Sequence, residues 1–230
     1  SAQYYFSDVP FLLLWGLKYL PISTPIEQFY ADAATGNLPS VSFVDPRFVG
    51  EAEGISGDDH PHGDIRTGDA FLADAFHAVA SGPDWATTVF IVTYDEWGGF
   101  FDHVPPPRAA APNDVDPDVV NGKALLGLRM PVVVASPFTR GSRENPRVSS
   151  TVFDNTSILK LIEWRWNLKP LTARDASGDV ANLAVALDLA HPDPVVPALP
   201  HPSAPPLAPC PPGFPVPTDL ALEDLFDLLP

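Results

Sequence analysis

The chain has 230 residues, 45% of them hydrophobic and 18% charged, so it can bury one sizeable core, and one domain is the simplest expectation. Thirteen basic residues stand against 29 acidic ones, giving a formal charge of −16 at pH 7. This acidity argues against a nucleic-acid partner and against attraction to anionic lipid surfaces. It fits a protein that binds cations or functions outside the cell.

The first part of the chain predicts two helices separated by a strand and a polar loop. Thr24-Pro25-Ile26-Glu27 has the form of a capping box and predicts a helix over 25–35 that ends at Gly36. A short strand is predicted over 40–44. A glycine-rich loop over 54–64 follows, and apolar residues at helical spacing then predict a helix over 69–81.

The next part predicts two buried strands and a further helix. The runs 89–92 and 131–135 carry no polar residue and are too short for helices, so each predicts a buried strand. A long loop rich in Pro, Asn and Asp separates them, and a helix over 156–166 is capped by Asp154 or Asn155. The fold class is α/β, with a largely parallel central sheet flanked by helices.

The C-terminal part changes composition. Twelve of the 29 prolines fall in residues 191–217, which predicts an extended, polyproline-like segment rather than packed core. A short amphipathic helix is expected over 218–230. The expected division is therefore a domain over 1–190, the Pro-rich segment and this terminal helix. The longest apolar run, 11–20, is too short to span a bilayer, so no transmembrane segment is expected.

The densest chemical signal is the segment from Tyr94 to His103. Asp95 and Glu96 follow the strand directly, at the position where open α/β sheets gather their ligand-binding residues. Two adjacent acids also occur in ordinary solvated turns. Gly98 and Gly99 favour a functional site, because glycines permit positive φ and close backbone approach. Hard carboxylate oxygens suit a divalent cation such as Ca²⁺, Mg²⁺ or Mn²⁺.

Two histidines complete the candidate set. His103 stands beside Asp102, which can fix its tautomer, and His60 lies in the acidic loop before the second helix. A loop histidine on its own is more often a polar surface residue. The residues alone predict a metal-assisted hydrolase. A glycosidase with two catalytic carboxylates is disfavoured, because side chains one residue apart seldom flank a bond at the roughly 5–9 Å separation such chemistry needs.

Several segments together resemble a known family. Asp58-Asp59-His60-Pro61 with Gly68, and Thr93 to Val104, are similar to the phosphoesterase family of bacterial and plant phospholipases C and acid phosphatases, within the alkaline phosphatase-like superfamily. The segments 127–131 and 153–160 match as well, and the resemblance covers roughly residues 25–175.

The resemblance implies a fold, an activity and a set of roles. It implies an alkaline phosphatase-like domain that hydrolyses phosphoric esters, with phospholipids or small phosphomonoesters as substrates. Asp95 and Glu96 would be metal ligands, and His60 and His103 would line the phosphate site as catalytic and phosphate-binding residues. A secreted or periplasmic location is expected.

The sequence also departs from the family pattern. Family members carry a Glu-Asn motif with further metal ligands, followed by a Ser or Thr nucleophile, and neither has a match here. Asn155 replaces a usual histidine, and Gly63 stands where some relatives have a second one. We therefore expect the C-terminal portion of a phosphoesterase, with the nucleophile-bearing N-terminal segment as a missing partner. The alternative is a non-catalytic remnant that binds cations or phosphate.

Overall fold

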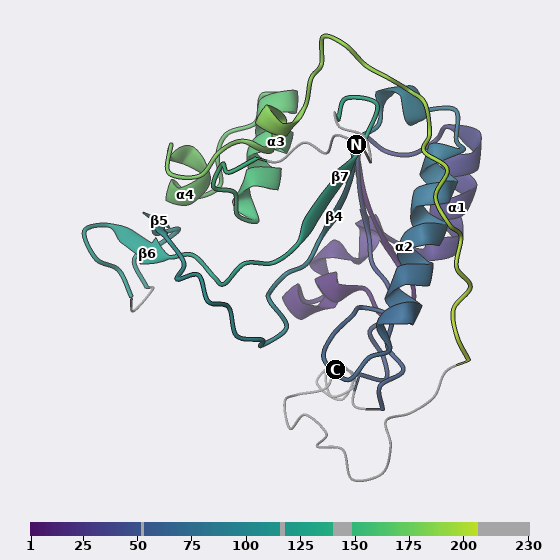
Figure 1. Cartoon of the computed structure of the whole chain (residues 1–230), viewed down its shortest axis with the longest axis horizontal. Helices are drawn as coiled ribbons and strands as arrows, with labels where there is room; N and C mark the ends of the chain where they lie inside the picture. Colours follow the sequence, from purple (N-terminus) through teal and green to yellow (C-terminus); the bar gives the residue numbers. More distant parts are fainter. Residues whose placement is uncertain (52, 116–117, 140–148, 207–230) are drawn as a thin grey trace. The chain divides into compact units, whose positions relative to one another are not determined.

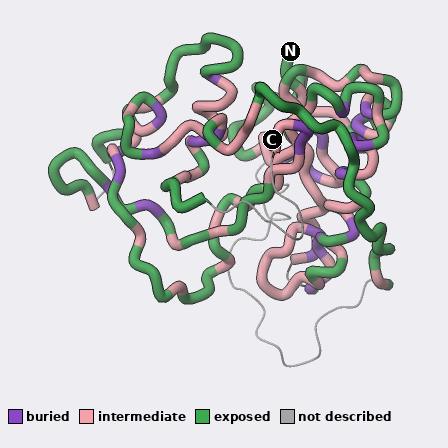
Figure 2. The backbone as a smooth tube through the Cα atoms, turned by 45° about the horizontal axis from the view of Figure 1, so that its top comes forward, coloured by how far each residue is buried: buried purple, intermediate pink, exposed green. Residues whose placement is uncertain are grey.

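The computed structural model describes residues 1–51, 53–115, 118–139 and 149–206, and it shows a mixed α/β protein (Figure 1). The chain forms two compact units, Ser1–Thr88 with Val195–Pro230, and Val89–Pro194. In both, buried stretches are short and most of the described backbone is intermediate or exposed (Figure 2).

The first unit is built on a parallel three-stranded sheet. Strand β1 (Ala2–Phe6) is central and pairs with β2 (Ser23–Pro25) on one side and β3 (Val41–Val44) on the other. Two 3-10 helices, η1 (Phe11–Trp15) and η2 (Leu17–Ile22), connect β1 to β2.

Helix α1 packs on β1 through an aromatic contact. Tyr5 of β1 is fully buried, and its ring lies 5.5 Å from that of Phe29 in α1. Its hydroxyl donates a 2.7 Å hydrogen bond to Asp32 Oδ2. Burial, followed by this contact with a carboxylate, raises the pKa of the Tyr5 hydroxyl. The sheet and α1 are therefore joined by both apolar packing and a buried polar contact.

Helix α1 (Ile26–Thr35) confirms the first predicted helix, but the capping box is wrong. Gly36 ends the helix in a left-handed conformation, with φ 71°, as expected. At the other end no side chain caps the helix, because Thr24 belongs to β2 and its hydroxyl accepts a hydrogen bond from Gln3. The local sequence pattern assigned the Thr24 hydroxyl to the helix cap, but this hydroxyl makes a tertiary contact with Gln3 instead.

Helix α2 (Ile65–Ala80) begins four residues before its predicted start. Asp64 caps it, since its carboxylate accepts a 3.0 Å hydrogen bond from the Arg66 N–H. Gly68 lies within the helix, against the side chain of Asp59. A further 3-10 helix, η3 (Trp85–Thr87), follows, and Trp85 stacks edge-on against Phe76 of α2.

The second unit contains two antiparallel pairs. Strand β4 (Phe90–Thr93) pairs with β7 (Val132–Ala135), with Ile91 opposite Val134. The hairpin of β5 (Arg108–Ala110) and β6 (Lys123–Leu125) occupies the predicted long loop. The expectation of buried parallel strands is wrong for β4 and β7: they are antiparallel to each other, and Val132 and Val133 are 42% and 57% exposed.

The helices of the second unit follow β7. Helix α3 (Thr156–Trp166) confirms the prediction, and the short helices α4 (Ala173–Ala176) and η4 (Leu183–Ala186) come after it. A small apolar cluster of Ala109, Leu126 and Val180 joins the hairpin to the segment after α4.

Residues 195–206 of the first unit run without helix or strand along α2 (Figure 1). His201 Nε2 lies 2.6 Å from Asp74 Oδ1, and its ring stacks on that of His77 with centroids 4.5 Å apart. The predicted terminal helix over 218–230 lies outside the described residues. Among the helices described, none is long and apolar enough to cross a membrane.

Candidate functional site

Asp95 and Glu96 lie two and three residues beyond the last residue of β4. Glu96 Oε2 accepts a 2.8 Å hydrogen bond from the Gly98 N–H, which curls the loop back on the carboxylate. Gly98 and Gly99 have φ values of 73° and 70°, as the glycine pair predicted. The consecutive left-handed residues turn the chain immediately after the two acids. They hold the Glu96 side chain against the backbone, while Asp95 is exposed.

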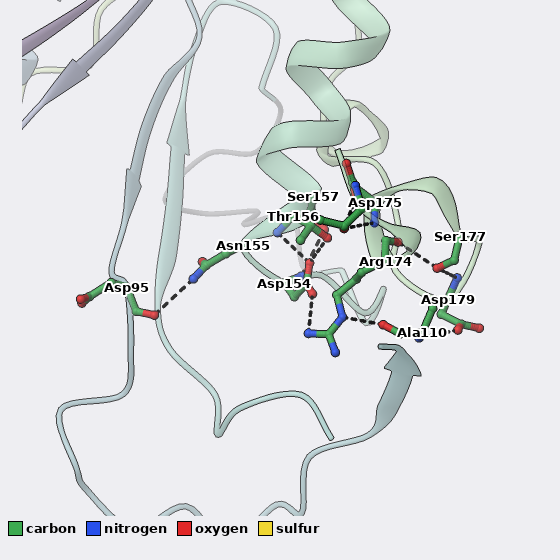
Figure 3. A network of polar contacts seen from close by, with 11 residues as sticks. Asp95, Ala110, Asp154, Asn155, Thr156, Ser157, Arg174, Asp175, Ser177 and Asp179 are labelled. Atoms are coloured by element: carbon green, nitrogen blue, oxygen red, sulfur yellow. Dashed lines mark hydrogen bonds and ion pairs between the residues drawn. The ribbon is translucent and has the colours of Figure 1, made fainter. Parts of the chain in front are cut away.

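The start of α3 lies beside Asp95. The Asn155 Nδ2 donates a 3.2 Å hydrogen bond to the Asp95 carbonyl oxygen (Figure 3). Asp154 rather than Asn155 caps the helix through its side chain: Asp154 Oδ1 accepts hydrogen bonds from Thr156 N at 2.8 Å and from Thr156 Oγ1 at 2.6 Å. Asp154 therefore fixes the start of the helix, and Asn155 fixes the loop that carries Asp95 and Glu96.

The Asp154 carboxylate belongs to a polar network that also includes residues of α4 and β5 (Figure 3). Arg174 Nη1 lies 3.7 Å from Asp154 Oδ2, and Arg174 Nε donates a 2.8 Å hydrogen bond to the Ala110 carbonyl oxygen of β5. The Ala110 N–H in turn donates to Asp179 Oδ2 at 2.8 Å. These contacts link α3, α4 and the hairpin, so the position of the α3 start is set by several elements of the unit.

His103 lies in an exposed loop of the same unit, and its side chain is 81% exposed. Its Nδ1 is 3.7 Å from Asp102 Oδ1, which is ion-pair range but too long for a hydrogen bond. Asp102 is instead held by Arg129, whose Nε and Nη2 each donate a 2.8 Å hydrogen bond to one carboxylate oxygen. These hydrogen bonds, with one from the Val104 N–H, hold the pKa of Asp102 well below its usual range.

His60 belongs to the other compact unit, in the loop before α2. Its Nδ1 lies 3.1 Å from the Pro61 carbonyl oxygen and 3.8 Å from Glu51 Oε2. Its backbone N–H donates to Asp58 Oδ1 at 3.2 Å, which shapes the loop. The side chain is 40% exposed, so it is open to a ligand. Of the predicted site residues, the second unit therefore holds Asp95, Glu96 and His103, and the first holds His60.

The residues present suit a divalent metal in type but not in number. Asp95 and Glu96 offer hard oxygen donors, which Ca²⁺, Mg²⁺ and Mn²⁺ prefer, but such ions take six or more ligands. In the described part of the chain, no group of three or more His, Cys, Asp or Glu side chains is arranged to hold a metal ion. The two acids therefore make part of a coordination shell at most.

The structure adds two residues to which sequence reasoning gave no role in the site. Arg129 and Asn155 both lie in segments that resembled the family, yet neither is an obvious ligand or acid–base group. Their contacts depend on bringing distant loops together: Arg129 reaches Asp102 over 27 positions, and Asn155 reaches Asp95 over 60. No local pattern encodes such pairs.

Comparison with family models identifies the family of the chain. Residues 16–169 match the model of the Phosphoesterase family, which covers more than half of the chain. The chain belongs to the Phosphoesterase family. The matched region includes the candidate ligands Asp95 and Glu96, both histidines His60 and His103, and the start of α3.

Individual relatives come from plants and mycobacteria. Non-specific phospholipase C6 of Arabidopsis thaliana is 34% identical over 191 residues, which is 75% of this chain and 36% of that protein. Non-specific phospholipase C1 of the same plant is 34% identical over 192 residues, 76% of this chain and 36% of the relative. Phospholipase C B of Mycobacterium tuberculosis is 37% identical over 192 residues, 76% of this chain and 34% of the relative. The chain thus spans about a third of the length of these relatives.

Proposed function

We propose that the protein hydrolyses phosphoric esters with the help of a divalent metal ion held in part by Asp95 and Glu96. The observation that carries this proposal is the pair of carboxylates directly after β4, inside the region that matches the Phosphoesterase family. The left-handed glycines and the Asn155 contact support it, because they fix the loop that carries the acids.

The histidines would act on the phosphoryl group and the leaving group. His103 is exposed, and in its protonated form it can donate a proton to the alcohol oxygen as the phosphorus–oxygen bond breaks. His60, also partly exposed, would hydrogen-bond a phosphoryl oxygen. A bound divalent ion would neutralise negative charge on the transferring phosphoryl group.

We propose that the attacking group comes from a part of the family's sequence outside the match. The two residues near strand ends that could compete have structural uses. Ser136 is buried, and its Oγ accepts a 3.2 Å hydrogen bond from the Phe138 N–H. The Thr93 hydroxyl donates to the Tyr94 carbonyl oxygen at 3.3 Å. Ser136→Ala and Thr93→Ala should therefore leave turnover unchanged.

The names of the relatives direct the choice of substrate. Each of the three compared above is called a phospholipase C, so a phosphodiester of a phospholipid is the first substrate we propose, with small phosphomonoesters second. An alkaline phosphatase-like fold remains part of this proposal. The parallel sheet of β1, β2 and β3 with its helices is compatible with that fold.

Metal binding is tested directly on the chain. Calorimetric titration with Ca²⁺, Mg²⁺ and Mn²⁺ should show binding that Asp95→Asn weakens at least about tenfold, since a carboxylate ligand is lost. Asp114→Asn removes an exposed carboxylate from the loop between β5 and β6 and is the matched control. No binding, or equal weakening by both variants, would remove the metal from the proposal.

Turnover is tested with p-nitrophenyl phosphorylcholine and p-nitrophenyl phosphate, with and without EDTA. The chain is compared with the same chain extended to the full length of its relatives. We expect metal-dependent turnover by the extended protein, with His103→Gln and His60→Gln each reducing it. Metal binding without turnover in either form would instead favour a cation-binding remnant.

A further inference from the structure

We propose that Arg129 is a positioning residue that draws Asp102 away from His103, so that the imidazole stays able to give up its proton. The inference rests on the proposed role of His103 as a proton donor. It concerns Asp102 and Arg129, to which the family comparison assigns no role.

The geometry is that of a clamped carboxylate. Asp102 accepts from Arg129 Nε at 2.8 Å, Arg129 Nη2 at 2.8 Å and the Arg129 backbone N–H at 3.2 Å. The Val104 N–H adds a fourth hydrogen bond, at 3.1 Å. Each carboxylate oxygen therefore already accepts two hydrogen bonds. The Asp102 side chain is only 12% exposed, so it has little freedom to turn toward another partner.

The contact of His103 with the Asp102 carboxylate is longer than the contacts of Arg129 with it. The His103 Nδ1 lies 3.7 Å from Asp102 Oδ1, nearly an ångström beyond the distances that Arg129 makes. A carboxylate paired only with a histidine stabilises the imidazolium and raises its pKa. A guanidinium on the same carboxylate cancels much of that charge. Among the described residues, Asp102 and Arg129 are the charged groups that the ion-pair geometry links to His103.

This arrangement suits a general acid. A proton donor is most effective when its pKa is near the working pH, and an imidazolium tightly paired with a carboxylate holds its proton too strongly. Asp102 can still orient the ring from 3.7 Å, because contacts between catalytic groups often tighten in the reacting complex. Arg129 thus holds the Asp102 carboxylate in place and offsets its charge, and it need not touch the substrate.

The first experiment follows the titration of His103 by NMR in the whole chain, with the resonance assigned from its loss in His103→Gln. In Arg129→Gln we expect the midpoint of the His103 titration to rise by at least about half a pH unit, since an opposite charge nearby shifts a pKa by one unit or more and exposure weakens the effect. Asp102→Asn should lower the midpoint. Arg129→Lys keeps the charge without the fork and should give a smaller rise.

Arg108→Gln is the matched control. Arg108 of β5 forms a similar pair with Asp118, with nitrogen and oxygen 3.0 Å apart. It should leave the His103 midpoint unchanged. An unchanged or lower midpoint in Arg129→Gln would overturn the inference. If that variant does not fold, a midpoint in Arg129→Lys equal to or below that of the parent would do so.

Turnover separates this inference from the proposed function. If His103 is the proton donor, the pH profile of kcat in the extended protein should shift with the His103 midpoint in Arg129→Gln. A shifted midpoint with an unchanged kcat profile would refute the role of His103 in turnover, while the control of the imidazole by Arg129 would stand.

Discussion

Gly68 is a position in the first unit where one added methyl group has a testable consequence. It lies inside α2, where alanine is ordinarily the better residue by about 1 kcal/mol. A Cβ built at Gly68, however, would lie 2.0 Å from Asp59 Oδ1 and 2.6 Å from Asp59 Cγ. Asp59 has a left-handed backbone, with φ 63°, so its side chain is held in a tight turn of the loop that also carries His60.

The magnitude follows from two opposed terms. Overpacking in a well-packed site costs typically about 1–3 kcal/mol, and the Asp59 carboxylate must move by more than an ångström to make room. Helix propensity returns about 1 kcal/mol. We expect Gly68→Ala to lower the free energy of unfolding by about 1–2 kcal/mol, which corresponds to a fall in Tm of roughly 2–8 °C for a chain of this size.

Urea unfolding of four proteins tests this reasoning: the parent, Gly68→Ala, Asp59→Gly and the double variant. In the double variant the clash is absent and glycine suits the left-handed position, so the alanine should stabilise the helix rather than destabilise it. Gly178→Ala is the control, because its added Cβ meets nothing within 4 Å. If Gly68→Ala stabilises the chain in the presence of Asp59, the packing argument is refuted.

Two further predictions concern titratable contacts. Burial, followed by a hydrogen bond with Asp175, raises the pKa of Glu163, so the stability it contributes is present below its unfolded pKa and lost as pH rises through the folded value. Glu163→Gln should therefore lose less stability than the parent in thermal melts as pH rises above the ordinary range of a glutamate carboxyl group; an equal loss in both proteins would contradict this. The contact of His201 with Asp74 is exposed, so Asp74→Asn should change the unfolding free energy by less than about 1 kcal/mol while loosening residues 195–206. Mobility can be followed with a spin label on Ser203→Cys in a Cys210→Ser background. The label should become more mobile in Asp74→Asn but not in the control His191→Ala. Unchanged mobility in Asp74→Asn would contradict the contact of residues 195–206 with α2.

The elements that the sequence predicted well are those with strong local patterns. Helix α1, strand β3 and helix α3 have clear apolar spacing and end signals such as Gly36, and each lies where it was expected. Helix α2 was predicted too short because an internal glycine weakens the pattern. Gly68 leaves room for the Asp59 side chain. That contact joins the helix to a separate loop and cannot be predicted from the helix alone.

The direction and burial of strands could not be predicted in the same way. An apolar run such as 89–92 has the same composition whether its partner is parallel or antiparallel. The described residues between β4 and β7 form a hairpin rather than a crossover helix, and antiparallel pairing of the two strands agrees with that connection. Strand β1, the centre of the parallel sheet, was missed because its five residues carry no boundary signal at the start of the chain.

The candidate site shows the same division between local and distant information. The left-handed glycines after Glu96 were predictable, because conformation at glycine is a local property. The partners of the site loops were not. Arg129 and Asp102 come from two loops, and the equal 2.8 Å contacts of their fork arise only once both loops are folded. Roles for His60, His103, Asp95 and Glu96 stay predictions that the experiments above address.

Asn155, where the family resemblance led us to expect a histidine, attaches the acidic loop to α3. A side-chain amide at this position donates to the Asp95 carbonyl oxygen, and a histidine N–H is also a hydrogen-bond donor. The amide, however, has no titrating proton, so this contact is independent of pH where that of a histidine would not be. Since Asp154 separately caps α3, position 155 is not needed for the helix start. In this chain the amide therefore attaches the acidic loop to α3 without placing a titratable side chain at position 155.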